Sequence, residues 1–304
     1  MNTFTGLSAF PLTPLHDDQV DEPSFIAMVQ RLCAAGVDSI TALGSTGSYM
    51  YLSREERARV AKLAVEHSTN VPVIIGVGAM RTSQVLANID DAKAAGAEGV
   101  LLAPVGYQKM SDSEVLDLYR AATDHSELPV IVYDNPGTTH FAFTNDLYAR
   151  IAALPGIASI KVPGVPDDPG KAKDHIAAIR SVLPAHVTIG VSGDAFGAAG
   201  LIAGCDAWYT AVGGILPQPM MAITRAAQSG DHHRALAASR DLQPLWSLFT
   251  EFGGSLRVSA AIAEHFGLAQ FDCLPKPIRG LDDAQRQKLI KVLLDLGLDE
   301  TVPG

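Results

Sequence analysis

The sequence has little that would tie it to a disulfide framework, a zinc site or a membrane. Its three cysteines, Cys33, Cys205 and Cys273, are far apart and form no C-x-x-C pair, which fits a reducing cytoplasm. No run of about 18 apolar residues predicts a membrane span. Residues 1–5 lack the basic and apolar regions of a signal peptide. We therefore expect a cytoplasmic protein with neither disulfides nor bound zinc.

Positive charge is also scarce, with 23 Lys and Arg residues against 33 Asp and Glu residues and a net charge of −10. Nucleic acids and anionic membranes need clustered basic residues, so we expect neither as a partner. A small anionic substrate is still possible, because a few positive groups or backbone N–H donors near the site are enough to bind it. The nine histidines show no H-E-x-x-H or similar spacing, which argues against a metal-dependent aldolase or hydrolase.

The sequence is built on a repeated unit, a short β-branched run followed by an amphipathic helical stretch. Eight such units predict an α/β fold, a (β/α)8 TIM barrel. A doubly wound open sheet is the alternative, but no G-x-G-x-x-G follows the first expected strand. The expected strands are Leu7–Phe10, Ser39–Leu43, Val73–Val77, Gly99–Ala103, Val130–Tyr133, Ala158–Lys161, Val187–Val191 and Ala207–Ala211.

Helical stretches separate these strands and continue after the last one. Ser53 and Glu56 form a capping-box pattern at one helix start, and Gly36 and Gly96 are typical of helix ends. We expect the barrel to occupy residues 1–229 and a C-terminal helical extension to occupy 230–304. The extension would serve oligomer contact or packing against the barrel. Its expected helices, after a last barrel helix at Pro217–Ser229, are His232–Phe252, Leu256–His265 and Asp283–Leu296.

Lys161 is the leading candidate for chemistry. It ends an expected strand, and such barrels carry their active sites at the C-terminal strand ends. Side chains alternate between the two faces of a strand, so Ser159 and Lys161 lie on the face opposite that of Ile160. If Ile160 packs outward against helices, Lys161 points into the barrel mouth. A desolvated amine there has a lowered pKa and becomes nucleophilic toward carbonyls. From position alone, a salt-bridged lysine at the barrel rim fits equally well.

Other polar residues follow the expected strands. Tyr133 ends the fifth strand, where a phenol could relay protons, although packing is the commoner role. The small polar loop Gly44–Gly47 after the second strand offers backbone N–H groups and hydroxyls to an anion, and it could equally be a plain turn. Tyr107 follows the fourth strand with the same ambiguity as Tyr133. Asp194 follows the seventh strand, where we expect it to cap the next helix.

Taken together, these segments resemble the dihydrodipicolinate synthase / N-acetylneuraminate lyase family of Schiff-base aldolases. The resemblance covers nearly the whole chain, and the order and spacing of the motifs are more specific than any one motif. Lys161, 28 residues after Tyr133, matches the family's Schiff-base lysine. The matching segments are Ala9-Phe10-Pro11-Leu12-Thr13-Pro14, Gly44-Ser45-Thr46-Gly47, Tyr133-Asp134-Asn135-Pro136-Gly137, Ile160-Lys161 and Ser192-Gly193-Asp194.

The resemblance implies catalytic roles. Lys161 would form an imine with pyruvate or another 2-oxo acid, with no further cofactor and no metal. Tyr133 would shuttle protons, with Ser45 as the relay hydroxyl. Tyr107 would be the third relay member, which many relatives donate across a subunit interface. The family also implies a homo-oligomer, a dimer or tetramer, with the tetramer expected.

Further positions would bind the substrate. Ser45 and Thr46 would hold the pyruvate carboxylate in the Gly44–Gly47 loop, where Gly44 and Gly47 allow the backbone to approach. Tyr209 lies near the family position whose backbone carbonyl lines the imine.

Thr138 departs from the family pattern in a way that bears on the second substrate. Dihydrodipicolinate synthases typically carry an arginine here to grip the carboxylate of aspartate semialdehyde. Threonine has no charge and cannot form a bidentate pair. The sequence therefore predicts an aldehyde acceptor other than aspartate semialdehyde, although Arg81 could enter from another loop. Met80 similarly replaces a polar residue of the lysine-feedback site, and Ser48 replaces a usual glutamate.

Several functions stay open at this point. One is a true 4-hydroxy-tetrahydrodipicolinate synthase of lysine biosynthesis. Another is an aldolase acting on 2-keto-3-deoxy sugar acids or on N-acetylneuraminate. A barrel that binds a 2-oxo acid without turning it over is a third, because one sequence does not show turnover. A phosphate-binding isomerase barrel would need an anion loop late in the chain, for which Val212-Gly213-Gly214 is the candidate.

Overall fold

The computed structural model describes residues 3–298 and contains a closed barrel of eight parallel strands. The strands follow one another in chain order, and β1 closes the barrel by pairing with both β4 and β10. This confirms the (β/α)8 barrel over the open sheet. The strands are β1 (Gly6–Ala9), β4 (Ser39–Ala42), β5 (Val73–Gly76), β6 (Gly99–Leu102), β7 (Val130–Tyr133), β8 (Ile157–Val162), β9 (Thr188–Val191) and β10 (Ala207–Thr210).

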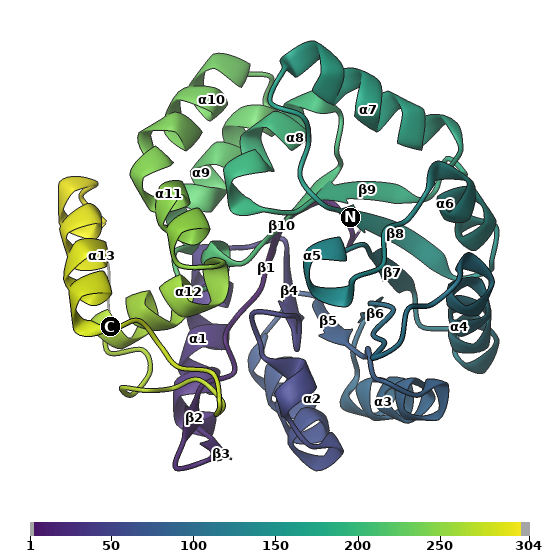
Figure 1. Ribbon diagram of the computed structural model, residues 1–304, viewed down its shortest axis with the longest axis horizontal. Helices are drawn as coiled ribbons and strands as arrows, with labels where there is room; N and C mark the ends of the chain where they lie inside the picture. The colour runs from purple at the N-terminus through teal and green to yellow at the C-terminus, as the bar shows by residue number, and fades with distance from the viewer. Residues whose placement is uncertain (1–2, 299–304) are drawn as a thin grey trace.

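Helices surround the barrel as a ring (Figure 1). The capping box of Ser53 and Glu56 begins α2, and Gly36 and Gly96 end α1 and α3 in the left-handed conformation, as predicted. The helices of the ring are α1 (Glu22–Ala35), α2 (Arg54–His67), α3 (Thr82–Ala95), α4 (Asp112–His125), α6 (Asn145–Ala152), α7 (Pro169–Ser181), α8 (Gly197–Ala203) and α9 (Pro217–Gln228).

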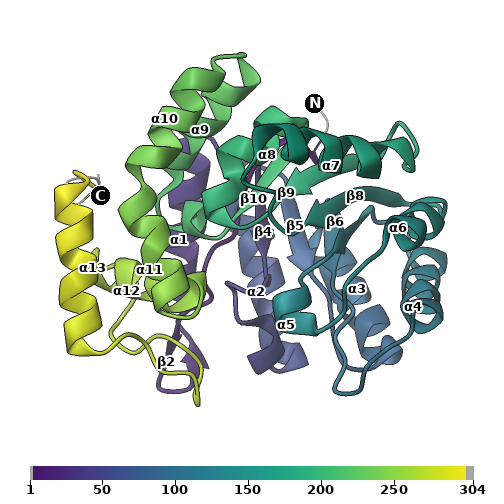
Figure 2. The same cartoon turned by 45° about the horizontal axis from the view of Figure 1, so that its top comes forward.

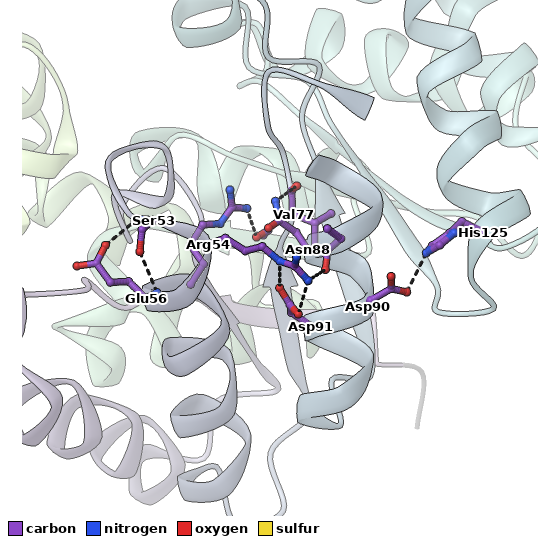
Figure 3. A network of polar contacts seen from close by, with 11 residues as sticks. Ser53, Arg54, Glu56, Val77, Asn88, Asp90, Asp91 and His125 are labelled. Atoms are coloured by element: carbon purple, nitrogen blue, oxygen red, sulfur yellow. Dashed lines mark hydrogen bonds and ion pairs between the residues drawn. The ribbon is translucent and has the colours of Figure 1, made fainter. Parts of the chain in front are cut away.

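Polar contacts join neighbouring helices of this ring (Figure 3). The Arg54 guanidinium on α2 donates to the Asp91 carboxylate on α3 at 2.7 Å. His125 at the end of α4 lies 2.8 Å from the Asp90 carboxylate. Each pair has one largely exposed partner and one partly exposed partner, and solvent-accessible ion pairs of this kind contribute little to stability. The helices of the ring are therefore held mainly by the apolar layers beneath them.

The strand side chains alternate between two apolar layers. Phe10, Ile74 and Ile131 belong to the layer inside the barrel, whereas Ile160 is fully buried in the layer between strands and helices. Lys161, the next residue, faces the interior, because its Nζ lies over the rings of Tyr133 and Phe10. The alternation predicted from the sequence is confirmed on this strand.

The C-terminal extension gathers on one side of the barrel, with α13 outermost (Figures 1 and 2). The single helix expected at His232–Phe252 is wrong, because α10 ends at Asp241 and α11 begins at Gln243. Pro244 lies in the first turn of α11, where the missing N–H costs nothing, whereas inside a continuous helix it would break a hydrogen bond. The extension contains α10 (His232–Asp241), α11 (Gln243–Glu251), α12 (Ser255–His265) and α13 (Asp283–Asp295).

The expected division at residues 229 and 230 falls in the turn between α9 and α10, and it stays a prediction as a domain boundary. Several small elements were not predicted. They are the hairpin of β2 (Leu15–His16) and β3 (Gln19–Val20), the one-turn helix α5 (Pro136–Thr139), and the 3-10 helices η1 (Tyr49–Tyr51), η2 (Asp194–Phe196) and η3 (Val212–Gly214). Within residues 3–298 no helix is both long and apolar enough to span a membrane. Over the same residues, no three His, Cys, Asp or Glu side chains are placed to hold a metal ion.

Candidate active site

A cavity of about 520 Å³ opens at the C-terminal ends of the barrel strands. Lys161 of β8 and Tyr133 of β7 lie in adjacent strands and are direct register partners. Ser45 and Thr46 reach the cavity from the loop after β4, and Tyr209 reaches it from β10. Together with Thr138, these residues make six of the proposed site residues that line one cavity.

Lys161 is 5% exposed and makes no salt bridge within the described part of the chain, which argues against the rim interpretation. Its Nζ lies 4.0 Å from the centre of the Tyr133 ring and 5.6 Å from that of Phe10. Burial lowers the pKa of Lys161 to about 7, although the carboxylates of Asp194 and Asp134 raise it. A substantial share of neutral amine is thus present at neutral pH.

The Tyr133 hydroxyl lies in a small polar cluster at the cavity wall. Its oxygen is 3.2 Å from the Ser45 hydroxyl, as the proposed relay requires. Asn135, which sequence analysis did not single out, donates from its side-chain amide to the Tyr133 hydroxyl at 2.9 Å and to the Ser45 hydroxyl at 3.4 Å. Burial raises the pKa of Tyr133, and the hydrogen bonds from Ser45 and Asn135 lower it.

The Gly44–Gly47 loop is tightly held. A Cβ at Gly44 would lie 2.5 Å from the Phe10 ring, so only glycine fits there. Leu43 and Ser48, on either side of the loop, have positive φ angles of 58° and 53°, which is strained for residues other than glycine. Thr46 lines the cavity, whereas Gly44 and Gly47 lie beside its lining. Contact of these two glycines with a substrate stays a prediction.

Tyr209 and Thr138 both line the cavity, and their contact with a substrate stays a prediction. The Tyr209 hydroxyl is 2.8 Å from the Ser159 hydroxyl inside the barrel, which fixes the ring below the cavity. Thr138 is exposed on α5 and lines the outer part of the cavity. Arg81 begins the α3 region and is absent from the lining. Among the described residues that line the cavity, Lys161 is the only cationic side chain.

Tyr107 is not brought into this site by its own chain. Its side chain is 88% exposed, and it lies in the loop between β6 and α4, outside the cavity lining. An aromatic ring this exposed has no packing role within the chain. Its role in the relay stays a prediction that depends on a second subunit.

Asp194 does not cap the helix that follows it, as was expected. Its carboxylate instead accepts hydrogen bonds from the backbone N–H groups of Ala211 at 3.1 Å and Val212 at 3.0 Å, after β10. Asp194 begins the 3-10 helix Asp194–Phe196, and neither this helix nor α8 after it has a side-chain cap. A buried carboxylate needs several donors, and the turn after β10 offers two that are free. Burial raises the pKa of Asp194, and these hydrogen bonds and the charge of Lys161 lower it.

The C-terminal extension contributes to the cavity, which the sequence interpretation missed. Phe249 of α11, the Gly253–Gly254 turn and Leu256 of α12 line its outer wall, joined by Ile278. The extension therefore does more than pack against the barrel or contact another subunit. The one available signal was the glycine pair between two helical patterns. Glycines favour turns, but they do not tell which surface the turn covers.

Asp134 is a buried carboxylate behind the site. It is 5% exposed, and its Oδ2 accepts a hydrogen bond from the Tyr148 hydroxyl on α6 at 2.5 Å. Burial raises its pKa to about 6, although Tyr148 and the charge of Lys161 lower it. A carboxyl group with a pKa above its unfolded value destabilises the folded protein in its ionised form, at pH values above about 6.

Replacing Asp134 with asparagine should therefore stabilise the protein near neutral pH, since the amide fits the same space and accepts from Tyr148. We expect a gain on the order of 1–3 kcal/mol at pH 7.5. The gain should shrink as the pH falls through 6 and vanish near pH 4. Melting temperatures across this range measure it, with the exposed Asp124→Asn as control. A gain that is equal at pH 4 and 7.5 would contradict this account.

Comparison with known proteins identifies the family and gives the same fold. The chain matches the model of the Dihydrodipicolinate synthetase family over residues 3–295. It is 28% identical over 298 residues to a 4-hydroxy-tetrahydrodipicolinate synthase from Phenylobacterium zucineum, covering 97% of this chain and 98% of that one.

Solved structures agree. A dihydrodipicolinate synthase from Agrobacterium tumefaciens superposes with a TM-score of 0.92 at 41% identity, covering 97% of this chain and 98% of that one. The E. coli K12 prophage protein YagE, solved in complex with pyruvate, superposes with a TM-score of 0.88 at 26% identity. The match covers 97% of this chain and 99% of that one. With a matching family model over nearly its whole length and a closed eight-stranded barrel, this chain belongs to the dihydrodipicolinate synthetase family of lyases and synthases.

Proposed function

We propose that this enzyme holds pyruvate, or another 2-oxo acid, as an imine on Lys161 and makes or breaks a C–C bond to an aldehyde. The observation that carries the proposal is the Lys161 amine, which is buried at the base of the cavity with a pKa of about 7. It lies against Tyr133, whose hydroxyl is within hydrogen-bonding distance of Ser45. A neutral amine beside a proton relay is what carbonyl addition requires.

In the proposed reaction, the Lys161 amine attacks the C2 carbonyl carbon of the oxo acid. The carbonyl oxygen leaves as water, and a protonated imine remains. Loss of a proton from C3 gives an enamine, whose C3 attacks the aldehyde carbon in synthesis. Hydrolysis then frees Lys161, and the reverse sequence cleaves the bond. Tyr133 and Ser45 pass the protons that the addition and the departure of water need. No metal or other cofactor enters these steps.

The carboxylate of the oxo acid would lie at the Gly44–Gly47 loop. Ser45 and Thr46 present hydroxyls to the cavity there, and Thr46 is 6% exposed. Their backbone N–H groups add neutral donors, as in other anion-binding loops. In this arrangement C2 of the oxo acid would lie near Lys161, and the outer half of the cavity, beside Thr138, would take the aldehyde.

The lining of that outer half favours an uncharged or hydroxylated aldehyde. Thr138 offers a hydroxyl where dihydrodipicolinate synthases carry arginine, and Arg81 is absent from the lining. The similarity to 4-hydroxy-tetrahydrodipicolinate and dihydrodipicolinate synthases supports the competing function, a synthase that uses aspartate semialdehyde. A charge-assisted pair contributes on the order of 1.5–3 kcal/mol. Its loss lowers acceptor affinity roughly ten- to a hundred-fold.

The acceptor proposal predicts poor condensation of pyruvate with aspartate semialdehyde, and better use of glyceraldehyde. Thr138→Arg should raise kcat/KM for aspartate semialdehyde roughly ten- to a hundred-fold, because it restores a cationic partner. Coupled assays of the wild type and Thr138→Arg with both aldehydes measure this change. A wild-type kcat/KM with aspartate semialdehyde of about 10⁴ M⁻¹s⁻¹ or more would show that this enzyme is a 4-hydroxy-tetrahydrodipicolinate synthase.

We also propose a homo-oligomer, with a tetramer expected, in which Tyr107 lies near a neighbouring active site. The support is the 88% exposed ring of Tyr107, at the end of the barrel that carries the cavity. Light scattering at micromolar concentration should give a multiple of the 32.0 kDa chain mass. A monomer under these conditions would contradict the proposal.

A further inference from the structure

Asn135 occupies an unusual place among the residues around the cavity. It follows β7 two residues after Tyr133, ahead of α5, and its side chain turns back to line the cavity. The amide nitrogen is 2.9 Å from the Tyr133 hydroxyl and 3.4 Å from the Ser45 hydroxyl. Asn135 thus contacts both hydroxyls of the proposed proton relay, which are themselves 3.2 Å apart.

The chemistry of these contacts gives the relay a direction. An amide nitrogen only donates, so both hydroxyl oxygens accept from Asn135. Because the oxygen of Tyr133 accepts from Asn135, its own O–H is left to donate toward Ser45 or the substrate. When Tyr133 gives up its proton, the same amide donates to the phenolate, and a hydrogen bond to a charged oxygen is the stronger kind. The contact therefore favours the deprotonated form that a relay passes through.

We propose that Asn135 is a positioning residue that orients Tyr133 and stabilises its phenolate, so that the relay of Tyr133 and Ser45 is anchored within a single chain. The inference rests on the proposed imine function. Tyr107, the other candidate for this contact, lies outside the cavity of its own chain. Asn135 is already in hydrogen-bonding distance without a second subunit. Its loss should therefore affect the relay more than the loss of the Tyr107 hydroxyl.

The test needs no knowledge of the aldehyde. An enamine on Lys161 exchanges the methyl protons of pyruvate with solvent, and NMR in D₂O follows this exchange. Asn135→Asp keeps the shape but replaces the donor with an acceptor, and Asn135→Leu removes all polarity at similar size. Both variants should slow exchange about 10- to 100-fold. The alkaline transition that belongs to Tyr133 should move to higher pH, further in the Asp variant. Tyr107→Phe should slow the exchange less than either Asn135 variant does.

The outcomes separate the two levels of the proposal. If the wild-type enzyme neither exchanges pyruvate protons nor forms a borohydride-trapped adduct, the imine function itself fails. If the wild type does both, but Asn135→Asp exchanges at the wild-type rate with an unshifted pH profile, Asn135 has no relay role. Exchange that falls equally at every pH, with a lowered melting temperature, would assign Asn135 to packing alone. The inference would also be overturned if Tyr107→Phe slowed the exchange as much as Asn135→Leu does.

Discussion

Replacing Lys161 with alanine or methionine should abolish turnover and pyruvate proton exchange, down to the limit of detection, while the protein stays folded. The amine is the proposed nucleophile, and no other lysine lines the cavity among the described residues. Without an imine, neither the enamine nor the C–C bond step has a route. Steady-state assays and NMR exchange measure the loss, and circular dichroism checks the fold.

The stability of these variants separates a catalytic lysine from a structural one. The pKa of Lys161 falls to about 7 on burial, so the folded protein binds its proton less tightly than the unfolded chain does. Folding stability therefore rises with pH between about 7 and 10.5 on account of this group. Lys161→Met removes that cost and should melt at or above the wild-type temperature at pH 7. A marked loss of stability there would mean that Lys161 supports the structure.

Tyr133→Phe should slow pyruvate exchange and turnover by roughly two to four decades, the usual scale for one acid–base group. The phenyl ring keeps the contact with Lys161, whose Nζ lies 4.0 Å from the ring centre, so the change isolates the hydroxyl. Pyruvate should still bind, since its proposed carboxylate contacts lie on the Gly44–Gly47 loop.

Ser45→Ala is the matched variant, because the Ser45 hydroxyl lies 3.2 Å from that of Tyr133. If both hydroxyls act as one relay, the double variant should be little slower than Tyr133→Phe alone, since effects within a unit are not additive. Unchanged exchange in Tyr133→Phe would return Tyr133 to a packing role.

The fold could be predicted from local patterns because a barrel repeats one local unit. Each strand is a short apolar run, and several helices carry their own start or stop signals, such as Ser53 with Glu56 and the final Gly36. The errors occurred where local signals are weak. The break near Leu242 depends on one proline, and the helix α5 contains only four residues.

The candidate site was predictable as far as strand order and alternation reach. Lys161 and Tyr133 end adjacent strands, so their meeting follows from the barrel itself. Asn135 was missed because its contacts depend on how the loop after β7 turns back, and no periodicity fixes that turn. The bonds of Asp194 to Ala211 and Val212 join segments 17 and 18 residues apart, beyond local capping rules.

Reduction with borohydride in the presence of pyruvate tests the central claim most directly. Borohydride converts an imine to a stable secondary amine, so the protein should gain the mass of one reduced pyruvate per chain. Peptide mapping by mass spectrometry should place it on Lys161, and Lys161→Met should gain nothing. An adduct on another lysine such as Lys276, or no adduct at saturating pyruvate, would contradict the account of this enzyme as a Schiff-base lyase or synthase.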